Sequence, residues 1–167
     1  MNQVGTGRAL PAPFRCGPFA VRPEWIDENA HLNLAHYVTL FDWATDALWR
    51  PIGLGDPLRA TGRGTFAAET HTRYRAELVE GETVSIESHL LACDEKRLHL
   101  AHEMLRDRDG AIAAQQELMF LSVDLGTRRV SPWPEAILAG LRTAVADHAA
   151  LGRPDWTGRA IAMPKRA

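Results

Sequence analysis

Residues 33–49, NLAHYVTLFDWATDALW, have the 3.6-residue period of an α-helix. Asn33 is placed to cap the start of this helix, and Pro51 and Gly53 end it. One face is predicted to carry Leu34, Val38, Phe41, Thr45 and Leu48, and the other side His36, Leu40, Trp43 and Ala47. Only Asp42 and Asp46 form a polar stripe. A helix that is apolar around most of its circumference is buried, so the rest of the fold must surround it.

The sequence after this helix changes to the two-residue period of β-strands. The alternation predicts strands over Thr65–Glu77, Thr83–Ala92, Arg97–Arg106 and Ala111–Val123. Their connectors, at residues 80–81, 94–96 and 107–110, have the composition of hairpin turns and predict an antiparallel meander. A short strand over Phe19–Ile26, broken at Pro23, precedes the helix. An amphipathic helix is predicted from near Pro134 to just before Gly152. The predicted fold is α+β, a curved antiparallel sheet wrapped around a long central helix, plus a C-terminal helix.

Length and composition indicate one domain of 167 residues. We expect an irregular N-terminal arm over residues 1–18, the folded domain over 19–150 and an irregular tail over 151–167. The net charge of −2 provides no basic field that would attract nucleic acid or an anionic membrane. Two cysteines, no apolar run of membrane-spanning length and no leader pattern predict a cytoplasmic protein that does not enter membranes.

Several kinds of chemistry lack their sequence signatures. No serine lies in a GxSxG elbow, and no glycine-rich phosphate loop occurs. His99 and His102 lie three residues apart on a predicted strand and so point to opposite faces, which is unsuitable for one metal ion. We interpret both as histidines whose hydrogen bonds are satisfied within the sheet, and we expect neither a metal nor a redox cofactor.

The polar residues Asp27, Asn29, His31 and Asn33 gather in the turn before the long helix. The N-terminus of a helix presents unpaired N–H groups and a partial positive charge, which together suit an oxyanion. These residues either cap the helix and organise the turn, or polarise and attack a carbonyl group. The residues by themselves leave both readings open.

Residues 21–33, VRPEWIDENAHLN, followed by Tyr37 and Phe41, resemble the D-x-N-G-H-M-N signature of hotdog-fold acyl-CoA thioesterases of the 4-hydroxybenzoyl-CoA thioesterase type. The resemblance covers residues 19–123 and includes the run ETHTRY at 69–74. Residues 41–48 and 95–100 are similar to thioesterases of carnitine breakdown, whose suggested substrate is betainyl-CoA. Ala30 replaces the usual glycine and Leu32 the usual methionine. If position 30 needs a positive φ, its methyl group affects the geometry of the turn.

The resemblance implies a thioesterase that hydrolyses a short acyl-CoA to free acid and CoA. Asp27 is then the catalytic carboxylate, acting either as nucleophile or as general base toward water. His31 and Asn33 orient the carboxylate, the water or the substrate, and Asn29 contributes to substrate binding. A hydratase or dehydratase, for which Glu69 and His71 supply a His–acid pair, and a non-catalytic acyl-CoA binder are the alternatives.

The resemblance also implies a homo-oligomer, either a dimer or a tetramer, whose strands join edge to edge. In that geometry Glu69 and His71 approach the Asp27 turn of the partner and take a substrate or supporting role. Arg73, Arg75, Lys96 and Arg97 are candidates for the phosphates of CoA.

An acyl group that carries a trimethylammonium is bound by aromatic rings, through cation–π contact, and by carboxylates, through charge attraction. The candidates in the sequence are Trp25, Tyr37, Trp43, Trp49, Asp42, Asp46 and Glu69. Core packing is the competing explanation for each of these aromatic residues.

Overall fold

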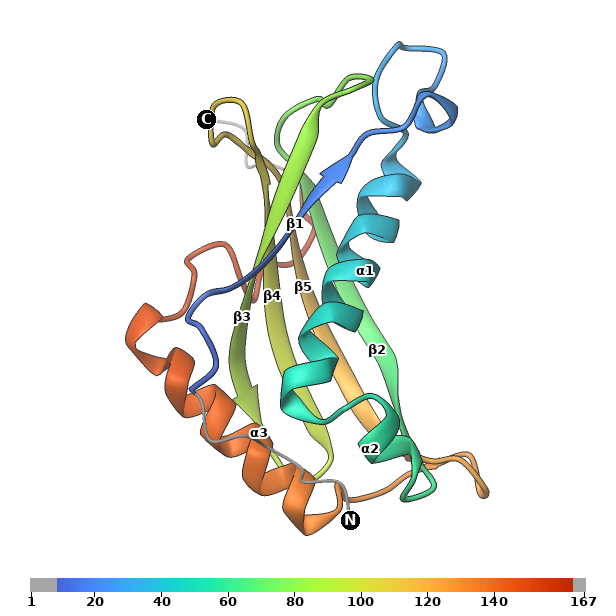
Figure 1. Ribbon diagram of the computed structural model, residues 1–167, viewed down its shortest axis with the longest axis vertical. Coiled ribbons are helices and arrows are strands. Elements are labelled where there is room, and N and C mark those ends of the chain that lie inside the picture. Colours follow the sequence, from blue (N-terminus) through green and yellow to red (C-terminus); the bar gives the residue numbers. More distant parts are fainter. Residues whose placement is uncertain (1–8, 164–167) are drawn as a thin grey trace.

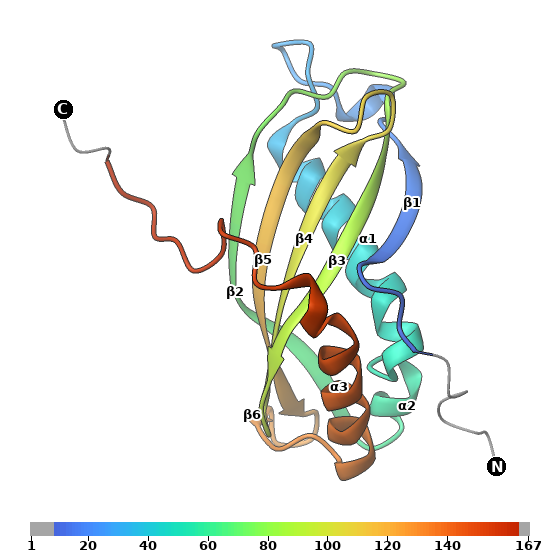
Figure 2. The same ribbon diagram turned by 90° about the vertical axis from the view of Figure 1, so that its left-hand side faces the viewer.

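A computed structural model of the chain describes residues 9–163 (Figure 1). In chain order its elements are β1 (Phe14–Ala20), the 3₁₀ helix η1 (Pro23–Trp25), α1 (Leu34–Ile52), α2 (Asp56–Arg59), β2 (Arg63–Tyr74), β3 (Thr83–Cys93), β4 (Arg97–Arg106), β5 (Ile112–Asp124), β6 (Arg129–Val130), α3 (Glu135–His148) and the 3₁₀ helix η2 (Ala149–Leu151). The sheet curves around α1, and α3 lies against β3 (Figure 2). The predicted α+β architecture is therefore confirmed.

The strand order is β1-β3-β4-β5-β2, with every neighbour antiparallel. The hairpins β3–β4 and β4–β5 are confirmed, but the predicted hairpin between the first two strands of the meander is wrong. β2 pairs with β5, and residues 75–82 cross the end of the sheet to reach β3. Side-chain alternation determines the faces of a strand but not its neighbour, and enclosing α1 requires β1 and β2 to lie on opposite edges.

Helix α1 buries Phe41, Thr45 and Leu48 of the predicted face but not the other two residues of it. Leu34 and Val38 are 63% and 39% exposed, whereas Tyr37, Leu40 and Ala44 are buried. Exposed positions 34, 38, 42 and 46 follow one another at intervals of four and form a single stripe along the helix. The helix also continues past Pro51 to Ile52 before Gly53 ends it with a φ of 79°. The sequence predicted a buried helix correctly, but only packing decides which stripe is left open.

His102 lies fully buried between the sheet and α1. Its Nδ1 is 2.9 Å from Ser88 Oγ and its Nε2 is 3.0 Å from Thr45 Oγ1. The Phe41 ring stacks on the imidazole at 5.7 Å. Burial lowers the pKa of His102 to about 3, so the ring is neutral near neutral pH. His99 faces the other side of the sheet and pairs with Glu117 at 2.6 Å, so both histidines have partners in the sheet, as predicted.

The N-terminal expectations need two corrections. The arm expected to be irregular through residue 18 contains strand β1, and the strand expected over Phe19–Ile26 is instead the end of β1 followed by η1. The glycines and prolines of this segment do not have the pattern of a strand, which is why β1 was not predicted. At Gly17 packing requires the glycine. With φ at +119°, a Cβ there would lie 2.9 Å from the carbonyl oxygen of Val84. Residues 1–8 of the expected arm lie outside the described part.

The C-terminal part of the chain contributes to the core. Ile137, Leu141 and Ala144 of α3 pack with the second half of α1, and His148 Nδ1 accepts the Leu90 backbone N–H at the edge of β3. The tail after residue 151 has no helix or strand up to residue 163. Its Trp156 is nevertheless buried and donates from Nε1 to Glu103 at 3.0 Å. Among residues 9–163, no helix has the length and apolar character needed to cross a membrane.

Candidate active site

The turn before α1 is closed by its own backbone. The Asp27 N–H donates to the His31 carbonyl at 2.9 Å, and the Ala30 N–H donates to the Asp27 carbonyl at 3.0 Å. Asp27 Oδ1 accepts the Asn29 N–H at 2.8 Å. Ala30 has a φ of 62°, so it occupies the left-handed region that glycine adopts without strain. Position 30 therefore has the positive φ at which the methyl group of Ala30 affects the geometry of the turn. Leu32, the other departure, is buried in the core.

Replacing Ala30 with glycine is expected to raise the free energy of unfolding by about 0.5–1 kcal/mol, because strain in the left-handed conformation outweighs the extra flexibility of the unfolded glycine chain. Urea unfolding measures the change. Ala35→Gly, in the first turn of α1, is the matched control and should lower stability by about 0.5–1 kcal/mol. Equal destabilisation by both substitutions would show that Ala30 is not strained.

Asn33 caps α1. Its side-chain Oδ1 accepts the Ala35 N–H at 3.0 Å, and its carbonyl accepts the His36 N–H at 3.0 Å. The Asn33 N–H is bound to the Trp25 carbonyl at 2.9 Å, which ties the cap to η1. The cap fixes the direction of the first helical turn and uses the Ala35 and His36 N–H groups, so the N–H group that this end of the helix offers to a ligand is that of Leu34. Asn33 thus acts on the site by positioning this turn.

A pocket of about 350 Å³ opens beside this helix start. One wall comes from the turn and α1, and the opposite wall comes from the end of β2 and the residues after it. It is lined by Asp27, His31, Leu32, Leu34, Tyr37, Tyr74, Arg75, Ala76 and Glu77. His31 Nε2 lies 2.9 Å from Glu77 Oε2 and joins the two walls. The Asp27 carboxylate is therefore in an open pocket, next to the N-terminus of a helix.

Two tyrosines contribute aromatic rings to the pocket. Their rings meet edge to face, 5.2 Å apart and at 82°. The Tyr37 hydroxyl donates to the Ala76 carbonyl at 3.1 Å, and the Tyr74 hydroxyl donates to the Leu34 carbonyl at 3.3 Å. Burial raises the pKa of both phenols, most of all through desolvation. Both hydroxyls therefore stay protonated near neutral pH and act as donors.

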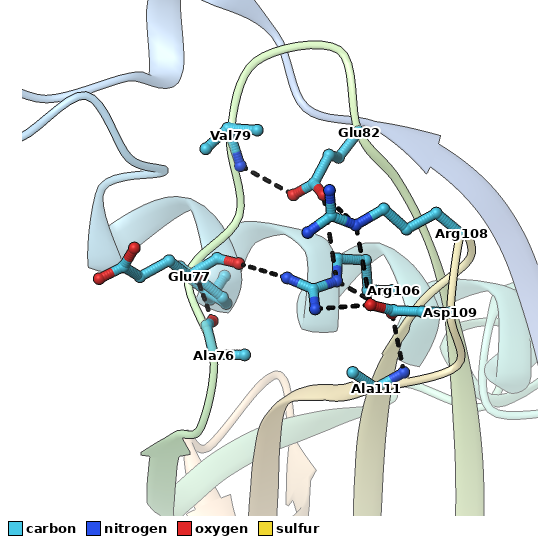
Figure 3. A network of polar contacts seen from close by, with 9 residues as sticks. Ala76, Glu77, Val79, Glu82, Arg106, Arg108, Asp109 and Ala111 are labelled. Carbon is cyan, nitrogen blue, oxygen red and sulfur yellow. Dashed lines mark hydrogen bonds and ion pairs between the residues drawn. The ribbon is translucent and has the colours of Figure 1, made fainter.

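Arg106 anchors the segment that carries Glu77. Its guanidinium donates to both Asp109 carboxylate oxygens, at 3.0 and 2.7 Å, and to the Glu77 carbonyl at 3.2 Å. Glu82 accepts the Val79 N–H at 2.9 Å and pairs with Arg108 at 2.9 Å. In Figure 3 the Glu77 carboxylate points away from this network. The network thus holds the backbone of the pocket wall while leaving the acidic side chain available to the site.

The structure brings only part of the predicted site together. Asp27, His31 and Tyr37 line one pocket, and Asn29 and Asn33 belong to the turn that shapes it. Trp43 does not line it. Instead, the Arg22 guanidinium lies 4.8 Å from the Trp25 ring and 5.4 Å from the Trp43 ring. A cation already covers these two indoles, so they are unsuitable for a cationic acyl group.

The remaining candidates lie elsewhere on the chain. Tyr74 packs on α1, so alternation places Glu69, His71 and Arg73 on the outer face of β2, the face away from α1. Lys96 and Arg97 lie where β3 turns into β4, at the opposite end of these strands from Thr83 and Arg106. Arg97 pairs with Asp94 at 2.7 Å. Within one chain, none of these five side chains lines the Asp27 pocket.

A second cavity of about 410 Å³ lies beside the later turns of α1. Asp42, Asp46 and Trp49 line it, together with Arg59, Arg63 and Phe66. These acidic and aromatic candidates therefore belong to a different cavity from Asp27. Among the described residues, no group of three or more His, Cys, Asp or Glu side chains is arranged to hold a metal ion.

Sequence reasoning missed Tyr74 and Glu77 as site residues. It extended the strand to Glu77, whereas the sheet ends at Tyr74 and the chain turns across the pocket. The Arg75 and Ala76 N–H groups both donate to the Ala113 carbonyl, at 2.8 and 3.1 Å. The regular pairing of β2 with β5 ends at this shared acceptor. No glycine or proline signals the turn in the sequence. Tyr74 belongs to the run that carried the resemblance, which was the one available hint.

Comparison with known proteins gives three kinds of similarity. The pattern of the thioesterase-like superfamily matches residues 21–141. A betainyl-CoA thioesterase of Pseudomonas aeruginosa is 39% identical over 145 residues, which are 86% of this chain and 91% of that protein. An L-carnitine dehydrogenase/betainyl-CoA thioesterase of Agrobacterium fabrum is 37% identical over 77% of this chain, which spans 26% of that longer protein. A Staphylococcus aureus protein solved in complex with CoA is 26% identical, with a TM-score of 0.84 over 95% of this chain and 100% of that one.

Proposed function

We propose that this chain, which belongs to the thioesterase-like superfamily and hydrolyses acyl-CoA thioesters, acts on a short acyl group that carries a quaternary ammonium, as in betainyl-CoA. The relatives named above support the substrate. Its curled sheet around α1 is the hotdog fold that the sequence resemblance implied. The observation that carries the proposal is the Asp27 carboxylate, which shares a pocket with the N-terminus of α1 and two tyrosine rings.

In the proposed mechanism the thioester carbonyl oxygen faces the Leu34 N–H at the start of α1, because the Ala35 and His36 N–H groups already donate to Asn33. Charge accumulates on this oxygen as the carbonyl carbon becomes tetrahedral, and an N–H group already oriented toward it stabilises that charge. The cap by Asn33 and the Trp25–Asn33 backbone bond hold this helix start in place before substrate arrives. Such preorganised donors contribute about 3–4 kcal/mol each to transition-state stabilisation in other acyl-transfer enzymes.

Asp27 performs the attack in one of two ways. As a general base, its carboxylate takes a proton from water while the water oxygen bonds to the carbonyl carbon. As a nucleophile, it forms a mixed anhydride that water then cleaves. On either route the carbon–sulfur bond breaks, the sulfur leaves as CoA thiolate and accepts a proton, and the free acid remains. No atom changes oxidation state, so water and protein groups suffice for the reaction.

His31 and Glu77 are assigned to orientation of the attacking group. The pair joins the turn to the opposite wall at 2.9 Å, which fixes the distance between Asp27 and that wall. The Asn29 N–H holds one oxygen of Asp27, leaving the other oxygen for water or for the carbonyl carbon.

We also propose a homo-oligomer, a dimer or tetramer, located in the cytoplasm. In the described part of the chain β2 pairs only with β5, so its other edge has unpaired backbone groups. Glu69 and His71 on β2 would then approach the site of a second copy, and basic residues such as Arg73, Lys96 and Arg97 would meet the phosphates of CoA. Cys16 and Cys93 are both free, in keeping with a reducing compartment.

A panel of acyl-CoAs assayed for release of free CoA thiol tests the substrate. Betainyl-CoA and 3,3-dimethylbutanoyl-CoA have the same shape and differ only in the charged nitrogen. After each kcat/KM is divided by the rate of spontaneous hydrolysis, which corrects for the electron-withdrawing ammonium, we expect the value to be about tenfold or more higher for betainyl-CoA, a difference of about 1.4 kcal/mol that cation–π and charge attraction can supply. Equal values for the two would overturn the cationic substrate. Binding without thiol release, or reversible hydration of an enoyl-CoA, would favour a binder or a hydratase instead.

A further inference from the structure

We infer that Tyr74 and Glu77, at the end of β2 and just beyond it, form the subsite that recognises the quaternary ammonium of the acyl group. The inference rests on the proposed function and names the specificity residues for it. Neither residue belongs to the predicted site, and both line the pocket that contains Asp27.

The chemistry of the acyl group restricts where such a subsite lies. In a betainyl group one methylene separates the nitrogen from the carbonyl carbon, so the two atoms are about 2.5 Å apart by standard bond lengths. The group that recognises the cation must therefore share the pocket of the group that attacks the carbonyl. This requirement excludes Asp42, Asp46 and Trp49, which line the other cavity. It also excludes Trp25 and Trp43, which do not line the Asp27 pocket.

The aromatic contribution comes from Tyr74. Tyr37 and Tyr74 meet edge to face, but Tyr37 is only 4% exposed while Tyr74 is 46% exposed. Tyr74 is thus the ring with surface left for a ligand. Its hydroxyl is held by the carbonyl of Leu34, the first residue of α1, at 3.3 Å. This bond places the ring beside the helix start where the carbonyl of the substrate is polarised. A cation within about 6 Å of such a ring gains cation–π energy.

The charge contribution comes from Glu77. The pocket is lined by two carboxylates, Asp27 and Glu77, and one guanidinium, Arg75, so negative charge is in excess whenever the His31 ring is neutral. The Glu77 side chain is 71% exposed and points away from the Arg106 network (Figure 3). Its contact with His31 ties it to the turn that carries Asp27.

The subsite is held in place before ligand binds. The Tyr74 backbone pairs with Ala114 of β5, and the Ala76, Glu77 and Leu78 carbonyls accept bonds from Tyr37, Arg106 and Leu32, at 3.1, 3.2 and 2.7 Å. Three consecutive carbonyls are thereby fixed by three different elements of the fold. Preorganisation of this kind lowers the entropy lost when a ligand binds.

The test compares betainyl-CoA with 3,3-dimethylbutanoyl-CoA in wild type and variants. Tyr74→Leu and Glu77→Gln are each expected to lower the ratio of kcat/KM values, charged over neutral, by about three- to tenfold. Hydrolysis of the neutral analogue measures any general damage. Tyr74→Phe retains the ring and its contact with Tyr37 but loses the bond to Leu34, so it should lower the ratio less than Tyr74→Leu does. Glu80→Gln, an exposed residue of the same crossing segment outside the pocket lining, is the charge control and should leave the ratio unchanged.

Tetramethylammonium chloride gives a second readout. It should inhibit hydrolysis of the neutral analogue by wild type, and Tyr74→Leu should weaken that inhibition several-fold. If wild type prefers betainyl-CoA and both variants keep the full preference, this subsite is overturned while the proposed substrate stands. If wild type shows no preference, the cationic substrate itself is wrong and the subsite falls with it.

Discussion

Replacing Asp27 with asparagine is expected to lower kcat for thioester hydrolysis by a factor of about 10³ or more, because an amide neither accepts a proton from water nor attacks the carbonyl carbon. The loss should fall on kcat rather than on KM, since substrate contacts of similar size remain. The melting temperature should change little. Asparagine retains a side-chain oxygen that can accept the Asn29 N–H, so the turn keeps its closing hydrogen bond.

Steady-state thiol release and thermal unfolding on the same preparations measure the two effects. Glu28→Gln is the matched control, because it removes a carboxylate from the adjacent, exposed position of the same turn. It should retain wild-type turnover. Full activity in the Asp27 variant would end the assignment of this carboxylate. A lost activity accompanied by a large drop in melting temperature would assign Asp27 a structural role instead.

Acidification is expected to destabilise the protein through His102. The pKa of this buried imidazole is lowered to about 3, against an ordinary value of 6.5, and desolvation is the cause. Between these two values the unfolded chain binds a proton that the folded chain does not. The stabilising contribution of the neutral ring is therefore complete above pH 6.5 and declines as the pH falls toward 3. From pH 7 to pH 5 the decline is about 2 kcal/mol in free energy of unfolding.

Urea unfolding at pH 7, 6 and 5 isolates this contribution when wild type is compared with His102→Gln. The variant is less stable at pH 7, because its bonds to Ser88 and Thr45 are altered, but it should lose about 2 kcal/mol less than wild type on going to pH 5. Leu100→Ala, on the same strand and fully buried, is the control that lowers stability while keeping His102. It should retain the wild-type pH dependence. An identical decline in the His102 variant would contradict the lowered pKa.

The part of the candidate site that could be predicted is the part formed by residues close together in the chain. Asp27, Asn29, His31 and Asn33 lie within seven residues, and the cap and Asx bonds that shape their turn are local. A left-handed Ala30 could also be suspected from one replaced glycine. The opposite wall of the pocket, formed by the end of β2 and the residues after it, could not be predicted in this way. Glu77 reaches His31 from a segment more than forty residues later in the chain, and nothing in its own sequence reveals that contact.

The sequence by itself determined the long helix, the four longest strands of the sheet and the polar turn before the helix, since periodicity, capping and turn chemistry act over a few residues. The tertiary structure alone decided that β2 pairs with β5 rather than β3, that Leu34 and Val38 face outward, and that Tyr74 and Glu77 complete the Asp27 pocket. Each of these depends on how the sheet closes around α1. That closure is a property of the whole set of buried faces, which no single stretch of sequence contains.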